Sequence, residues 1–127
     1  MSLNAAERKS ASSNIRVVHV RRDRYDVYVG RPHRFVAKTQ WGPYGNPFDV
    51  KTFGLGEALR RYDEWLFQPA QSALRAKMRA ELRGKVLACW CAPKGGIAAF
   101  SPDRICHAQT IAQVALSESD ADLGAGG

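Results

Sequence analysis

The central part of the chain alternates between strand-type and helix-type hydrophobic patterns. Segment 15–20 is rich in β-branched residues, and segment 25–30 places Tyr and Val on alternate positions, so both are predicted to be short strands. Segment 85–91 is almost entirely apolar, which is typical of a strand buried on both faces. We therefore expect two strands early in the domain and a third in its second half.

Apolar residues at helical spacing predict three helices. The first covers 55–66 and has one apolar face. The second covers about 73–82 and stops at Gly84, a good C-terminal cap. The third is predicted to begin with Ser101 as its N-cap and Pro102 at its first helical position.

The order of these elements indicates the fold class. Two strands, two helices, a strand and a last helix predict an α/β fold, with a small, partly parallel sheet covered by helices in a Rossmann-like layer architecture. Between the second strand and the first helix, residues 31–53 contain three prolines and two glycines. Long irregular segments in compact domains are usually functional, so we expect this one to contribute to a site.

The two ends of the chain differ from its middle. Residues 1–14 are predicted to be a disordered arm and 118–127 a disordered acidic tail, which leaves 15–117 as a single domain. The sequence contains no apolar run of about 18 residues and no apolar stretch near its start, so we expect neither a membrane partner nor a secretory signal. A cytoplasmic location is the resulting expectation.

The charge of the middle segment favours anionic partners. Residues 15–117 hold seventeen Lys and Arg residues against eight Asp and Glu residues. A basic domain favours phosphate-bearing ligands or nucleic acid as partners, although a basic surface can also serve solubility alone.

Three cysteines and a histidine form the sharpest group of candidate residues. Cys89 and Cys91 share one face of the third predicted strand, opposite Trp90, and stand at its carboxyl end. Cys106 and His107 fall early in the last helix, where the helix dipole favours a thiolate or a bound anion. Ligands of open α/β sheets gather outside the carboxyl ends of strands, so these residues are expected to face one crevice.

Three interpretations of this group remain open. Three sulfurs and an imidazole match a zinc ligand set in type, but adjacent residues of a helix point about 100° apart, so we assign no metal ligand. Alternatively, Cys106 is a reactive thiol and His107 an acid or base. Buried cysteines that only fill a core are the third interpretation.

A second group follows the second predicted strand. Arg31 sits where that strand ends, and its guanidinium can grip a phosphate or carboxylate. Trp41 and Phe48 could stack on a base, and Asn46 could pair with a base edge. The competing interpretation is a turn-rich loop whose aromatic rings fill the core.

Several short motifs stand in order along residues 15–116, namely Val17-Val18-His19, Tyr28-Val29-Gly30-Arg31-Pro32, Trp41-Gly42, Asn46-Pro47-Phe48, Cys89-Trp90-Cys91-Ala92-Pro93 and Cys106-His107. In combination they resemble the bacterial and phage family catalogued as domain of unknown function 4326. The resemblance implies motif positions within these segments and carries no settled activity. The chain differs from the family pattern in a twelve-residue spacer, 94–105, which predicts an extra loop at 95–101 beside the site.

These observations predict a domain that binds a nucleotide, a nucleoside or nucleic acid at the carboxyl edge of its sheet and could act on a base or nucleoside. The expected catalytic residues are Cys106 and His107. The expected ligand-binding residues are Tyr28, Gly30, Arg31, Trp41, Asn46, Phe48, Cys89 and Cys91. The alternatives are a non-catalytic nucleic-acid-binding module, with or without zinc, and a protein-interaction domain. The pattern specifies no cofactor.

Overall fold

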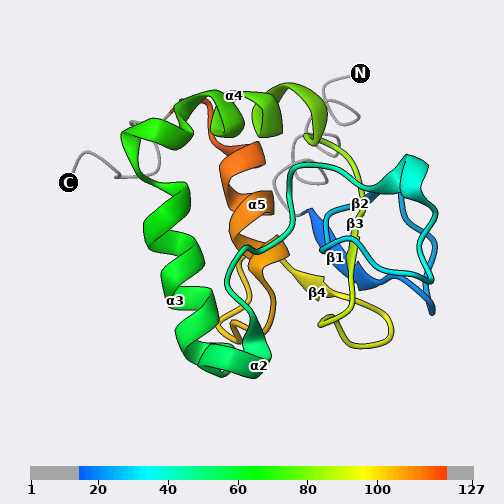
Figure 1. Ribbon diagram of the computed structural model, residues 1–127. Helices are drawn as coiled ribbons and strands as arrows, with labels where there is room; N and C mark the ends of the chain where they lie inside the picture. Colours follow the sequence, from blue (N-terminus) through cyan, green and yellow to red (C-terminus); the bar gives the residue numbers. More distant parts are fainter. Residues whose placement is uncertain (1–14, 120–127) are drawn as a thin grey trace, which may run out of the picture.

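A four-stranded sheet forms one side of the fold (Figure 1). The structure is a computed structural model that describes residues 15–119, so the expected arm at 1–14 and residues 120–127 of the expected tail lie outside the described residues. The strands lie in the order β2-β3-β1-β4. Their bounds are β1 Arg16–His19, β2 Val27–Tyr28, β3 Leu87–Cys89 and β4 Ile97–Ala98.

Three of these strands run in the same direction. β3 lies in the middle, where Leu87 is opposite Val17 of β1 on one side and Val27 of β2 on the other, both in parallel pairing. β4 runs antiparallel to β1 at the sheet edge. The predicted small, partly parallel sheet is therefore confirmed. Because parallel strands end at the same edge, the residues that follow Tyr28 and Cys89 leave the sheet side by side.

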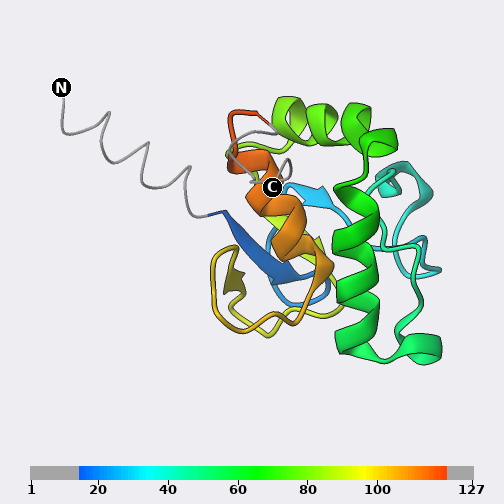
Figure 2. The same ribbon diagram turned by 90° about the vertical axis from the view of Figure 1, so that its left-hand side faces the viewer.

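The helices lie together on one side of the sheet (Figures 1 and 2). α5 packs directly on β1 and β3, and α3 and α4 pack against α5, which confirms the expected cover of helices. The helical elements are α2 Val50–Phe53, α3 Leu55–Leu66, α4 Ser72–Glu81 and α5 His107–Leu116, with short 3-10 turns η1 Lys38–Gln40 and η2 Pro69–Gln71. None of the helices within residues 15–119 has the length and apolar character needed to cross a membrane.

α3 shows how the hydrophobic pattern fixes an element. Ala58, Leu59, Tyr62 and Leu66 recur at helical spacing and are all buried, so the helix stacks one face against the core. The opposite face carries Glu57, which forms ion pairs along the helix surface. The predicted helix at 55–66 is confirmed at both ends.

The predicted start of the last helix was wrong. α5 begins at His107, and its N-cap is Cys106, whose Sγ accepts a hydrogen bond from the backbone N–H of Ala108 at 3.4 Å. Gln109 completes a capping box, because its side-chain oxygen accepts from the Cys106 N–H at 3.1 Å. The Ser101 hydroxyl instead accepts from the N–H of Asp103 at 3.2 Å, which closes a local turn upstream of the helix.

β2 and β3 are shorter than their sequence patterns. Ahead of β2, the backbone oxygen of Val86 accepts from the N–H groups of Asp26 and Val27 at 2.8 Å and 3.1 Å. The N–H of Val86 donates to a carboxylate oxygen of Asp26 at 2.7 Å, so a side chain takes the place of one backbone acceptor there. β3 ends at Cys89, and the chain bends at residues 90–92. The alternation of faces that the sequence predicts therefore does not continue through Trp90.

Candidate functional site

A pocket of about 470 Å³ opens at the carboxyl edge of β2 and β3. Pockets for small ligands usually enclose roughly 300–1,000 Å³, so its size suits one small molecule. Its lining comes from the ends of β2 and β3, the segment before α2, and the first residues of α2, α3 and α5. The lining residues are Gly30, Arg31, His33, Asn46, Phe48, Asp49, Val50, Lys51, Leu55, Leu59, Cys89, Trp90, Cys91 and His107.

The pocket collects most of the residues singled out from the sequence. Seven of them lie in its lining, namely Gly30, Arg31, Asn46, Phe48, Cys89, Cys91 and His107. Three others, Tyr28, Trp41 and Cys106, do not. The two groups of candidates, one after each of two neighbouring strands, thus share one site, while their roles in binding or catalysis stay predictions.

Tyr28 lies outside the pocket lining and holds two lining residues in place through its hydroxyl. Its hydroxyl donates to the backbone oxygen of Arg31 at 2.5 Å and accepts from the indole Nε1 of Trp90 at 2.9 Å. Burial raises the pKa of Tyr28, so the hydroxyl keeps the proton that it donates. A Cβ on Gly30 would lie 2.5 Å from this hydroxyl, which explains the glycine at that position. Tyr28 therefore positions two lining residues.

The rim of the pocket carries two cations and one carboxylate. Arg31 pairs with Asp49 at 3.3 Å, and the two side chains remain 55% and 42% exposed. Asp49 is the N-cap of α2 and accepts from the backbone N–H of Lys51 at 3.2 Å, and this hydrogen bond is the main reason that the pKa of Asp49 is lowered. Lys51 also lines the pocket, and its ammonium group forms no ion pair within residues 15–119.

Aromatic rings form one wall. His33 and Trp90 stack at a slant, with ring centroids 4.2 Å apart and an interplanar angle of 33°. Phe48, which also lines the pocket, meets the ring of Phe53 edge to face, with ring centroids 6.2 Å apart. A flat ring can lie against such surfaces. The sequence pattern identified neither His33 nor Trp90 as a lining residue. Trp90 was missed because it lies in the bend after β3 rather than in the strand.

Asn46 and Trp41 are occupied with internal contacts. The Asn46 side chain accepts from the N–H of Phe48 at 2.8 Å and donates to the backbone oxygen of Ala58 at 3.4 Å. Asn46 therefore holds the loop against α3. The sequence pattern had instead predicted that its amide pairs with a base edge. Trp41 donates through Nε1 to the backbone oxygen of Val36 at 3.0 Å and closes its own loop, outside the pocket lining.

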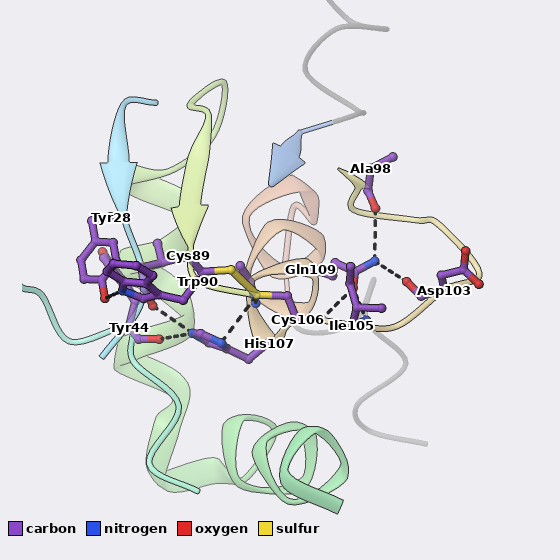
Figure 3. Close-up of a disulfide and its surroundings, with 12 residues drawn as sticks. Tyr28, Tyr44, Cys89, Trp90, Ala98, Asp103, Ile105, Cys106, His107 and Gln109 are labelled. Atoms are coloured by element: carbon purple, nitrogen blue, oxygen red, sulfur yellow. Dashed lines mark hydrogen bonds between the residues drawn. A yellow bond between two sulfur atoms is a disulfide. The ribbon is translucent and has the colours of Figure 1, made fainter. Parts of the chain in front are cut away.

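The cysteines converge despite the long spacer between them. Cys89 and Cys106 are fully buried, and the structure records their sulfurs as a disulfide (Figure 3). Cys91 is exposed, and burial of its sulfur by neighbouring atoms raises the pKa of its thiol. The Sγ atoms of all three cysteines lie within 4.8 Å of one another. The end of β3 and the start of α5 therefore meet at a cluster of three sulfurs.

His107 is held beside this cluster in a defined orientation. Its Nε2 lies 2.9 Å from the backbone oxygen of Val29 and 3.2 Å from that of Tyr44, while its Nδ1 lies 3.9 Å from the Sγ of Cys106 (Figure 3). Carbonyl oxygens only accept hydrogen bonds, so Nε2 carries the proton and Nδ1 keeps a free lone pair. Burial lowers the pKa of His107, which favours this neutral form.

Asp49 and Lys51 were also absent from the expected site. An Asp followed by a short polar and apolar stretch is a helix N-cap signal, and it could have placed both residues at the start of α2. Arg31, which follows β2, pairs with Asp49 at this helix start.

Comparisons with known proteins give one match. No curated protein and no solved structure shows significant similarity to the chain. The sequence model of the family described as Domain of unknown function (DUF4326) matches residues 14–117, a span that contains every helix and strand from β1 to α5. The chain belongs to the DUF4326 family, as its motifs indicated.

Proposed function

We propose that the pocket binds a small molecule that joins a planar ring to an anionic group, such as a nucleotide. One observation carries the proposal: a ligand-sized hollow at the carboxyl edge of parallel strands combines a cationic rim with aromatic and apolar walls. This combination suits a phosphate at the mouth and a base inside.

Arg31 is the main anion ligand in this proposal. Its guanidinium group is more than half exposed and lies on the rim, so a phosphate can reach it from solvent. Two parallel N–H donors fit a phosphate well, and an anion there competes with the Asp49 carboxylate for the same guanidinium. Lys51 adds a second positive charge on the same side.

The base is proposed to lie against the ring pair formed by His33 and Trp90, in a pocket whose lining also includes the apolar side chains of Leu55 and Leu59. Trp90 is fixed by its hydrogen bond to Tyr28, so its ring offers a preorganised stacking surface. A base that stacks in this way loses contact with water on the stacked face, which adds affinity without base specificity.

Binding of the four nucleoside monophosphates and their matching nucleosides tests the proposal by isothermal titration calorimetry. Hydrogen bonds to charged groups contribute about 1.5–3 kcal/mol, so Arg31→Ala is expected to weaken nucleotide binding about tenfold or more. Arg24→Ala is the control, because Arg24 is exposed, carries the same charge and lies outside the lining. Equal losses in the two variants, or no nucleotide binding by the native chain, would overturn the proposal.

An exposed aromatic group beside the pocket favours a second candidate, single-stranded nucleic acid. Phe35 is 60% exposed, and the guanidinium groups of Arg34 and Arg21 lie 4.8 Å and 5.4 Å from its ring centroid. His33, a lining residue, lies 5.4 Å from the same ring. Stacking rings flanked by arginines are typical of surfaces that bind single strands.

Fluorescence polarisation with a labelled mixed-sequence oligonucleotide separates the two candidates. Stacking of one base contributes about 1–3 kcal/mol, so a strand-binding surface predicts at least about a fivefold loss of oligonucleotide affinity in Phe35→Ala. The control is Phe100→Ala, since Phe100 is also 60% exposed but follows β4. If Phe35→Ala and Phe100→Ala behave alike, the nucleic-acid candidate is dropped and the mononucleotide proposal is unaffected.

A further inference from the structure

We propose that Cys89, Cys91, Cys106 and His107 form a tetrahedral Zn²⁺ site that joins the end of β3 to the start of α5. The set contains three thiolates and one imidazole nitrogen, a combination typical of structural zinc. The proposal does not depend on nucleotide binding, and it adopts the zinc interpretation that the sequence left open without assigned ligands.

The sulfur positions suit a shared ion. Zinc–sulfur bonds of about 2.3 Å at tetrahedral angles require sulfurs about 3.8 Å apart. The three Sγ atoms all lie within 4.8 Å of one another, and those of Cys89 and Cys106, which the structure records as a disulfide, separate toward that spacing once the pair is reduced. The Cα atoms of Cys89 and Cys106 are 7.7 Å apart, whereas the Cα atoms of disulfides are usually about 4.4–6.8 Å apart. Two cysteines that bind the same ion accommodate this separation of their Cα atoms. An ion is also bound by Cys91, whereas a disulfide between Cys89 and Cys106 does not involve it.

The imidazole supplies the fourth ligand. The Nε2–H of His107 donates to the backbone oxygens of Val29 and Tyr44, so the lone pair of Nδ1 is free on the side of the Cys106 sulfur, 3.9 Å away. A tetrahedral zinc ion with bonds of about 2.3 Å to sulfur and 2.0–2.1 Å to nitrogen places those two atoms about 3.6 Å apart. Metal-bound histidines usually donate their other ring N–H to a carbonyl or carboxylate, as His107 does.

The backbone conformation allows the adjacent residues Cys106 and His107 to bind one ion. Residues that follow one another within a helix diverge by about 100°, but Cys106 is the N-cap of α5, with an extended φ of −150° and ψ of 138°. Its side chain is therefore not bound by helical geometry and points toward the same region as the imidazole of His107 (Figure 3).

The surroundings of Cys106 also favour a thiolate. The Cys106 sulfur accepts from the Ala108 N–H at the positive end of α5, and both features stabilise negative charge on sulfur. A thiol reductant converts the Cys89–Cys106 disulfide to two thiols, and each of the three thiols then releases its proton when it binds the ion. Four protein ligands close the coordination sphere, so the ion holds the sheet and the core helix together, and it fixes the pocket wall that contains Cys89 and His107.

The first test is the metal content of the full chain, prepared under reducing conditions without chelator and measured by inductively coupled plasma mass spectrometry. About one zinc ion per chain is expected. Cys91→Ser is the informative variant, because Cys91 is exposed and its replacement leaves the core intact, and it is expected to lose most of the zinc while its circular dichroism spectrum is unchanged. His19→Gln is the control, since His19 is not one of the four proposed ligands and its Nδ1 already accepts from the N–H of Arg21 at 3.1 Å, so this variant is expected to keep the zinc.

Zinc K-edge X-ray absorption identifies the ligands. The proposal predicts three sulfurs at about 2.3 Å and one nitrogen at about 2.0–2.1 Å. It is overturned if the reduced apo-chain takes up no zinc, if Cys91→Ser holds zinc as tightly as the native chain, or if intact-mass analysis of chain purified without reductant or chelator shows the loss of two hydrogens and no bound metal.

Discussion

Gly30→Ala tests how the pocket is positioned, because Gly30 lies between Tyr28 and Arg31. An added Cβ would lie 2.5 Å from the Tyr28 hydroxyl and 2.6 Å from its Cζ atom, far inside van der Waals contact. Tyr28 is only 2% exposed and its hydroxyl is hydrogen-bonded to Arg31 and Trp90, so its ring cannot move away without losing these contacts. The φ angle of Gly30 is not positive, so the effect is steric rather than conformational.

The expected destabilisation follows from these contacts. Overpacking of a core costs about 1–3 kcal/mol, and displacement of the hydroxyl weakens hydrogen bonds to Arg31 and Trp90 that contribute about 0.5–1.5 kcal/mol each. We therefore expect Gly30→Ala to lower the free energy of unfolding by about 2–5 kcal/mol. For a domain of this size, the melting temperature falls by roughly 10 °C or more.

Urea unfolding followed by circular dichroism measures the effect. Gly56→Ala is the matched control, because Gly56 lies in α3 and a Cβ there meets nothing within 4 Å. Alanine in a helix is about 0.5–1 kcal/mol better than glycine, so this variant gains stability. If Gly30→Ala unfolds within about 0.5 kcal/mol of the native chain, the reasoning about Tyr28 is refuted.

Three further predictions concern stability. Hydrogen bonds from Arg60 and Arg61 lower the pKa of Glu57 to about 2, below its unfolded value. The stabilising effect of the Glu57 carboxylate is therefore present above pH 4.5 and is lost as the pH falls toward 2. The urea midpoint of Glu57→Gln should lie below that of the native chain at pH 7 and match it at pH 2. Arg75→Ala leaves two carbonyl oxygens near the end of α3 without their donor, and we expect a loss of about 2–4 kcal/mol in the same assay, against a smaller loss in Arg75→Lys. Removal of zinc by a chelator under reducing conditions should lower the melting temperature measured by calorimetry, and a transition unaffected by the chelator contradicts a structural ion.

The sequence was informative wherever a local pattern decided the structure. The helical spacing from Leu55 to Leu66 identified α3 at both ends, and the β-branched and apolar runs located β1 and β3. The candidates Arg31 and Cys89 shared a site because each stands at or just after the carboxyl end of a parallel strand, a consequence of topology alone.

The errors arose where tertiary contacts overrode local cues. Ser101-Pro102 is a strong start signal for a helix, yet the capping box of Cys106 and Gln109 sets the start, and cysteine is a rare cap. Strand alternation predicted that Trp90 points away from the face that Cys89 and Cys91 share. The chain bends after β3, however, and Trp90 lines the pocket together with both cysteines. Neither the bend nor the side-chain contacts are visible in hydrophobic periodicity.

The indole region of the two-dimensional ¹H–¹⁵N NMR spectrum tests the central claim most directly, because the chain has three tryptophans in different places. Trp90 lines the pocket, whereas Trp41 closes its own loop and Trp65 packs beside Tyr62 in α3. On titration with a nucleoside monophosphate, we expect the Trp90 indole N–H signal to shift with saturation while those of Trp41 and Trp65 stay in place. Shifts confined to Trp41 or Trp65, or no saturable shift of Trp90 with any of the four nucleotides, contradict a nucleotide site at this edge of the sheet.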